Sequence, residues 1–130
     1  MDAGYSIKQR GDVTVICLLR LVNLEEILGI IDVIATLGNR EKRLWLLGDY
    51  VRLTPEEMSE IGNYGRDRIE GSSRVAYVAA DDLTFGLTSI QVAYREARGF
   101  EDQIFRDEES ALEWLGTQAA ASRASGHLVD

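Results

Sequence analysis

The feature that most constrains the fold is a regular alternation between short apolar runs and segments with helical periodicity. Residues 13–19 (VTVICLL) and 74–80 (RVAYVAA) are apolar on both faces, as strands inside a parallel sheet are. Residues 43–47 form a third short apolar run between them. Segments whose apolar residues recur at the 3.6-residue period of a helix separate the runs. Strands that alternate with helices predict an α/β domain with a largely parallel sheet.

The predicted element order is β-β-α-β-α-β-α-β-α. Residues 5–9 alternate weakly between apolar and polar, and a turn at Gly11 separates them from residues 13–19. This spacing predicts an antiparallel first hairpin in an otherwise parallel, and therefore mixed, sheet. We expect the strands beginning near Val13, Arg43 and Arg74 to form the centre of that sheet. The predicted helices are residues 23–37, 54–69, 83–98 and 107–117, and the last strand is residues 103–106.

The length and composition predict one domain over residues 1–118. Residues 119–130 are rich in Ala and Ser, and we expect them to form a flexible C-terminal tail. No apolar stretch approaches the ~20 residues of a membrane span, and no signal segment begins the chain, so we expect no membrane insertion. Cys17 is the only cysteine, which excludes an intramolecular disulfide and favours a cytoplasmic location.

The charge balance argues against anionic partners. The formal net charge is −8 and the isoelectric point is near 4.7. Nucleic-acid binding depends on clustered Lys and Arg that displace counterions from phosphates, and the basic residues here are scattered. We therefore expect no nucleic-acid partner.

The residues required by the common catalytic and metal sites are missing or misplaced. His127 is the only histidine and falls in the predicted tail, so no Ser-His or Cys-His pair is available. A two-histidine metal site is excluded. Residues 62–65 (GNYG) lack the spacing and the Lys-Ser/Thr ending of a phosphate-binding loop. The sequence therefore indicates no catalytic residue, no metal site and no cofactor.

Acidic pairs are the remaining candidates for acid–base or metal chemistry. Each pair falls at the start of a predicted helix, where a carboxylate complements the helix dipole and caps free N–H groups. Helix capping is our prediction for these pairs, and an acid–base or metal site is the alternative. They are Glu25-Glu26, Glu56-Glu57, Asp81-Asp82 and Asp107-Glu108-Glu109.

Two segments resemble a known family. Residues 104–115 (IFRDEESALEWL) are similar to the closing segment of the SpoIIAA-like (STAS/SEC14-type) domains, where a short strand ending in Phe leads into a helix with an Ala-Leu-x-Trp-Leu core. Residues 74–82 (RVAYVAADD) are similar to that family's central strand and its acidic turn. The element order is also similar, over about residues 4–116.

The resemblance implies a STAS-like mixed sheet flanked by helices and a non-enzymatic role. Better-known STAS domains bind partner proteins, some are switched by phosphorylation of a serine at the start of the second helix, and other relatives are thought to bind lipids. The matching stretch here, residues 48–57 (GDYVRLTPEE), lacks the Asp-Ser-x-Gly motif, which leaves Thr54 as the candidate phosphoacceptor position. We predict that Thr54 is instead a helix cap, because Glu56 and Glu57 would repel a phosphate there.

The first predicted helix carries more apolar residues than a single core-facing stripe accounts for. In the first helix, one apolar stripe is wide enough to cover a sheet, and Ile30, Val33 and Leu37 lie on a flank beside it. This flank is the candidate surface for a partner or an apolar ligand; contact with a neighbouring helix of the same domain is the alternative. The expected core stripe of the third helix is Leu83, Leu87, Ile90, Tyr94 and Ala97.

These observations predict a non-catalytic protein-interaction or regulatory module, with self-association as one form of that role. A protein partner or a homodimer is the expected contact. The alternative is binding or carriage of a lipid or other apolar small molecule. A sizeable apolar pocket would favour the small-molecule role, whereas a filled core and exposed apolar side chains would favour the interaction role.

Overall fold

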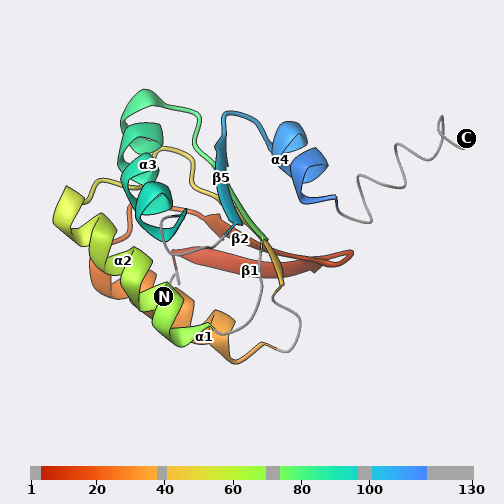
Figure 1. Cartoon of the computed structure of the whole chain (residues 1–130), viewed down its shortest axis with the longest axis horizontal. Helices are drawn as coiled ribbons and strands as arrows, with labels where there is room; N and C mark the ends of the chain where they lie inside the picture. Colours follow the sequence, from red (N-terminus) through yellow and green to blue (C-terminus); the bar gives the residue numbers. More distant parts are fainter. Residues whose placement is uncertain (1–3, 38–40, 70–73, 97–100, 117–130) are drawn as a thin grey trace, which may run out of the picture.

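A computed structural model describes residues 4–37, 41–69, 74–96 and 101–116, the last three residues of the third range by their backbone alone. The element order β-β-α-β-α-β-α-β-α matches the prediction from sequence (Figure 1). The predicted tail, with His127, lies outside the described residues. The strands are β1 Tyr5–Arg10, β2 Val13–Leu18, β3 Lys42–Leu46, β4 Arg74–Val78 and β5 Glu101–Phe105. The helices are α1 Leu24–Ala35, α2 Pro55–Arg68, α3 Asp82–Glu96 and α4 Glu108–Leu115.

The five described strands form one mixed sheet in the order β1-β2-β3-β4-β5. β1 pairs antiparallel with β2, through Tyr5 opposite Leu18 and Arg10 opposite Val13. The three remaining pairings are parallel. The predicted first hairpin is therefore confirmed, and β2, β3 and β4 occupy the centre of the sheet as expected.

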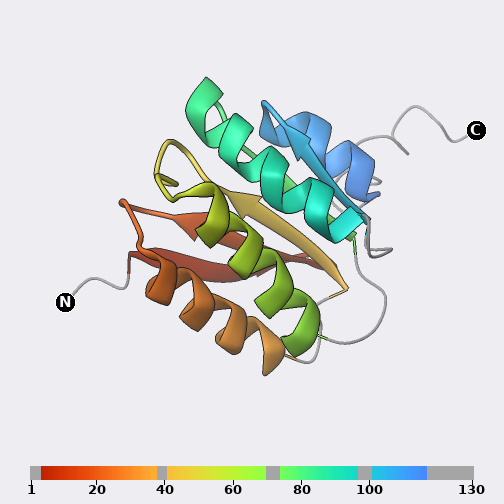
Figure 2. The ribbon, with the colours of Figure 1, turned by 60° about the vertical axis from the view of Figure 1, so that its left-hand side comes forward.

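The sequential strand order determines where the helices lie. The connection between two parallel strands is right-handed. When each new strand lies next to the previous one and always on the same side of it, every right-handed connection places its helix on the same face of the sheet. Figure 2 shows α1, α2 and α3 side by side across this face of the sheet. α4 follows the last strand and contacts β3, β4 and β5 from the opposite face.

In the described sheet, the strands lie side by side in the order in which they occur along the chain, and this order reverses nowhere. Ligands of open α/β sheets commonly bind at the point where the order reverses, in the crevice between two diverging loops. The fold therefore does not supply this crevice among the strands that the structure describes.

Each face of the sheet has its own buried apolar cluster. The larger cluster lies under α1 and α2 and includes Ile16, Trp45 and Val75. The smaller one lies under α4 and includes Val13, Leu44 and Leu115. No helix within the described ranges has both the length and the apolar character required to cross a membrane.

Candidate functional site

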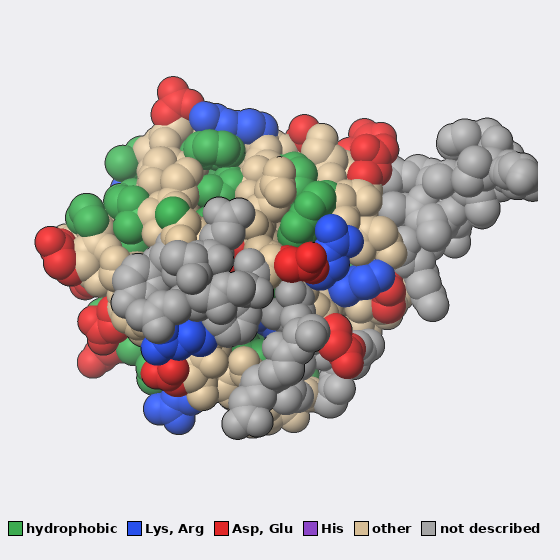
Figure 3. Space-filling view, viewed as in Figure 1, with side chains coloured by type: hydrophobic (Ala, Val, Ile, Leu, Met, Phe, Trp, Pro, Cys, Tyr) green, Lys and Arg blue, Asp and Glu red, His purple; other side chains and the backbone are tan. Residues whose placement is uncertain are grey.

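Exposed leucines lie at the end of the sheet where the parallel strands finish. Leu19 and Leu21 follow β2 and are 55% and 57% exposed, and Leu83, in the first turn of α3, is 52% exposed. Figure 3 shows further hydrophobic side chains gathered over α3, with acidic side chains near the rim of this face. Exposed apolar side chains that form a contiguous patch mark interaction sites, and these leucines are the candidate for such a patch. We call this side the carboxyl-end surface; it comprises residues 19–23, 47–54, 79–83 and 106–107.

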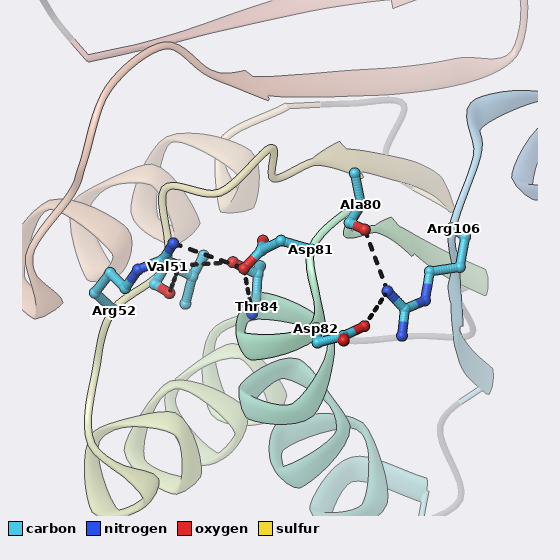
Figure 4. Close-up of polar contacts among 7 residues, drawn as sticks. All are labelled: Val51, Arg52, Ala80, Asp81, Asp82, Thr84 and Arg106. Atoms are coloured by element: carbon cyan, nitrogen blue, oxygen red, sulfur yellow. Dashed lines mark hydrogen bonds and ion pairs between the residues drawn. The ribbon is translucent and has the colours of Figure 1, made fainter.

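Arg52 connects two loops of the carboxyl-end surface. Its Nη1 donates hydrogen bonds to the Thr84 hydroxyl (2.9 Å) and to the Val51 carbonyl (3.0 Å), and its Nη2 lies 3.6 Å from the Asp81 carboxylate (Figure 4). Asp81 in turn accepts the backbone N–H of Thr84 at 3.2 Å and so caps α3. This network fixes the loop after β3 to the start of α3.

Arg106 makes a second bridge at the end of β5. Its Nη1 donates to the Ala80 carbonyl (3.2 Å) and pairs with Asp82 at 2.9 Å (Figure 4). The guanidinium also lies over the Phe85 ring, 4.1 Å from the ring centroid. The positive charge of Arg106 is therefore matched by a neighbouring carboxylate.

In each acidic group at a helix start, one carboxylate makes the predicted capping contact. The Asn23 side chain accepts the Glu26 N–H (2.8 Å), and Glu26 accepts the Asn23 N–H (2.9 Å), which completes a capping box at α1. At α4, Asp107 accepts the Ser110 N–H at 2.8 Å. These carboxylates occupy the positions at which a helix N-terminus would bind an anionic ligand.

Thr54 is also a structural cap. Its hydroxyl accepts the Glu57 N–H at 3.1 Å, and Glu57 accepts the Thr54 N–H at 2.9 Å. Pro55 begins the helix, where its missing N–H costs nothing. The geometry gives the Thr54 hydroxyl a structural role, and the prediction that Thr54 is not a regulated phosphoacceptor stays a prediction.

The capping contacts also keep the carboxylates ionised. Hydrogen bonds from Arg20 and from the Asn23 backbone lower the pKa of Glu26. The Thr84 side chain, its backbone N–H and the charge of Arg52 lower the pKa of Asp81. A general acid at neutral pH requires the opposite shift, a raised carboxyl pKa. In the chain as described, no three His, Cys, Asp or Glu side chains gather closely enough to hold a metal ion.

A second group of polar side chains lies inside the domain, between α3 and the sheet. The Gln91 side-chain amide donates to the Tyr77 hydroxyl (3.0 Å), and that hydroxyl donates to Asp102 (3.2 Å). Arg43 of β3 is also buried, and the strand register places Arg43 and Asp102 on either side of Val75 in one row. The hydrogen bonds of Gln91, Tyr77 and Asp102 thus form a buried polar network that links two strands and a helix.

A small cavity adjoins this network. Its volume is about 40 Å³, and most of its lining is apolar, including Trp45 of β3 and Ile61 of α2. Its polar lining consists of Arg43, Tyr77, Thr88 and Gln91.

The candidate surface predicted on the first helix is only partly available. Ile30 is fully buried and is not part of an exposed flank, whereas Val33 is 39% exposed and Leu37 is half-buried. The buried residues Ile27, Ile30, Ile31 and Ile34 show that the helix presents Ile30 within its core-facing stripe. The predicted core-facing stripe is therefore rotated about the helix axis relative to the observed one. It includes Leu24, Leu28 and Ala35, which are only half-buried, and omits Ile30.

The predicted core stripe of the third helix is wrong in its first residue. Leu83 is exposed, and Leu87 and Ile90 are half-buried; the side chains of Tyr94 and Ala97 lie outside the described residues. The most buried residues of α3 are instead Thr84, Thr88 and Gln91, and Leu87 and Ile90 pack against the core as partly buried side chains. These polar residues are satisfied largely by Arg52 and Tyr77, which come from other parts of the chain.

Sequence reasoning missed both candidate sites. A signal for the interior network was present in the 4-3 spacing of Thr84, Thr88 and Gln91, which puts three polar side chains on one helical stripe. Nothing in the sequence distinguishes Leu19 and Leu21 from the apolar strand they follow, because their exposure depends on where β2 ends.

Comparison with known proteins adds no assignment: the chain matches no family model, and no curated protein or solved structure is significantly similar to it.

Proposed function

We propose that this chain is a non-catalytic protein-interaction module of STAS-like type that docks a partner protein through its carboxyl-end surface in the cytoplasm. The observation that carries the proposal is the exposure of Leu19, Leu21 and Leu83 on one side of the domain. Burying a leucine contributes about 1.5–3 kcal/mol. Three leucines more than half exposed therefore represent a substantial binding energy that the isolated chain leaves unused.

The polar framework of this surface supports recognition over catalysis. Arg52 and Arg106 are each held by carboxylates and by backbone carbonyls, so the loops are ordered before any partner binds. Preorganised loops lower the entropy cost of association. At this surface, hydrogen bonds from Thr84 lower the pKa of Asp81 and hydrogen bonds from Ser110 lower the pKa of Asp107, which suits capping and gives no acid for catalysis.

The charges indicate the chemistry of the partner. The chain carries a net charge of −8, and the carboxyl-end arginines named above are already paired with acids. A second copy of the chain would bring the same excess of negative charge to the interface. We therefore infer a partner segment with apolar side chains bordered by Lys or Arg.

The cavity gives less support to carriage of a lipid. An engineered core cavity that accepts benzene measures about 150 Å³, whereas the cavity here is about 40 Å³. An alkyl chain would have to displace the helices that cover the sheet. The small cavity and the exposed leucines together favour the interaction role.

Site-specific photocrosslinking in cells would test the proposal. A photoreactive amino acid is placed at Leu21, at Leu83 or, as the matched control, at Val33, which is also exposed but lies on α1. We expect adducts with one and the same basic partner from positions 21 and 83, and none from position 33. In a binding assay with that purified partner, Leu21→Asp and Leu83→Asp should weaken the complex at least tenfold, and Val33→Asp should not.

Two results would contradict this proposal. Adducts formed chiefly with a second copy of the chain would show self-association in place of a basic partner. Adducts formed chiefly from position 33 would place the partner surface on α1, as the sequence predicted for Val33.

A further inference from the structure

Gly86 lies inside α3, at a position where the fold of the isolated chain does not require a glycine. It is exposed, and a methyl group at this position would meet no atom within 4 Å beyond its own helical turn. Its backbone is helical and has no positive φ. A glycine inside a helix lowers the folding equilibrium constant about two- to fivefold relative to alanine. The glycine therefore costs stability and brings no contact within the described chain.

The neighbours of Gly86 on the helix surface are large and apolar. Leu83 precedes it by three residues and Ile90 follows it by four, so the helical period puts all three on one side of α3. Leu83 is 52% exposed and Ile90 is half-buried. Figure 3 shows hydrophobic side chains gathered over this helix. The missing side chain of Gly86 thus leaves a gap between two apolar side chains, which we call the Gly86 gap.

The charge beside the Gly86 gap is negative. Among the described side chains of α3, residues 82–93, Asp82 is the only charged one, and it lies one turn before Gly86. Arg106 pairs with its Oδ1 at 2.9 Å, yet the Asp82 side chain remains 96% exposed. A carboxylate has two acceptor oxygens, so Asp82 can accept a second cation while it keeps Arg106.

We propose that a basic amphipathic helix of the partner crosses α3 at Gly86, with a large apolar side chain seated in the Gly86 gap and a Lys or Arg beside Asp82. A small residue at the point of contact lets two helices approach closely, and a side chain of one then fits between the side chains of the other. This inference rests on the proposed function and adds the element of the partner and its point of contact. A second copy of α3 fits less well, because its described side chains include no Lys or Arg to meet Asp82.

The chain provides a matched control in Gly29 of α1. Gly29 is exposed, and a methyl group there would likewise meet no atom within 4 Å, but the exposed side chains one turn away include the acids Glu25 and Asp32. Gly29→Ala and Gly86→Ala should each raise the folding equilibrium constant of the full chain about two- to fivefold in urea unfolding. A loss of stability in Gly86→Ala would show that the fold requires this glycine, and would overturn the inference.

Binding of a defined peptide separates the two glycines. The probe is a synthetic amphipathic helix of Leu and Lys, titrated into the full chain by isothermal calorimetry, and the charge control is the same peptide with Glu in place of Lys. An added methyl group in a packed contact forces side chains or backbone to move, so we expect Gly86→Ala to weaken binding of the Lys peptide by about fivefold or more. Gly29→Ala should bind it as the unmodified chain does, and the Glu peptide should not bind.

The inference is overturned if the Lys peptide does not bind the unmodified chain, if both alanine variants bind it equally, or if the Glu peptide binds as well. Leu21→Asp and Leu83→Asp distinguish this failure from failure of the proposed function. If these two variants weaken binding and Gly86→Ala does not, the carboxyl-end surface stands and the crossing at Gly86 is wrong. If none of the three weakens binding, the surface itself is wrong.

Discussion

Removing one hydroxyl from the interior network should destabilise the protein far more than the same change at the surface. Tyr77→Phe deletes the hydroxyl that accepts from Gln91 and donates to Asp102, both of which are buried. An unsatisfied buried polar group costs about 1–3 kcal/mol. The Gln91 amide loses its acceptor in the variant, so we expect a loss of about 1–3 kcal/mol. For a domain of this size, the loss corresponds to a fall in Tm of about 3–12 °C.

The chain provides a matched control in Tyr64. The Tyr64 hydroxyl donates to the exposed carboxylate of Asp32 at 2.8 Å, so Tyr64→Phe breaks a phenol–carboxylate contact in solvent. We expect this variant to lose less than about 1 kcal/mol, because water replaces the lost partner. Thermal and urea unfolding of both variants would measure the difference. If Tyr77→Phe costs no more than Tyr64→Phe, the interior network does not stabilise the fold, and the reasoning is refuted.

Three further predictions concern the surface. Thr54→Ala should lower the free energy of unfolding by about 0.5–2 kcal/mol, and Thr54→Ser should leave it almost unchanged. Stoichiometric phosphorylation of Thr54 that changes partner binding would exclude a purely structural role. The backbone and side-chain hydrogen bonds that lower the pKa of Asp107 in the folded state stabilise the fold above the unfolded pKa of about 4. This contribution is lost as the pH falls through the folded pKa, so urea midpoints between pH 5 and pH 3 should fall less steeply for Asp107→Asn, which keeps a capping side chain. Val33→Asp should remain folded by circular dichroism and sediment like Glu25→Ala; loss of self-association in the Val33 variant alone would move the partner surface to α1.

The sequence predicts the fold well where the determining interactions are local. The caps at Asn23 and Thr54 involve residues three positions apart, and the hairpin depends on a turn at Gly11. The order and the centre of the sheet follow from periodicity along single segments. These features need no knowledge of which segments meet in space.

The errors arise where a distant residue determines the outcome. The face of α3 was predicted on the rule that apolar residues are buried, but Arg52 and Tyr77 supply partners that allow Thr84 and Gln91 to be buried instead. Ile30 was assigned to a flank because α1 has apolar residues over most of its circumference, and the sequence does not fix the centre of its buried face. Both errors concern the rotation of a helix about its own axis.

The rotation of α3 links the interior network to the proposed partner surface. Leu83, Leu87 and Ile90 form a stripe about 100° from the buried stripe of Thr84, Thr88 and Gln91, at 100° per residue. A helix rotated by that angle would bury the leucines but would break the hydrogen bonds from Arg52 to Thr84 and from Gln91 to Tyr77. Several unsatisfied groups at about 1–3 kcal/mol each offset the gain from leucines that are already partly buried. Directional hydrogen bonds therefore select the observed rotation over the more apolar one. The same selection leaves Leu83 exposed at the carboxyl-end surface, where a partner can cover it.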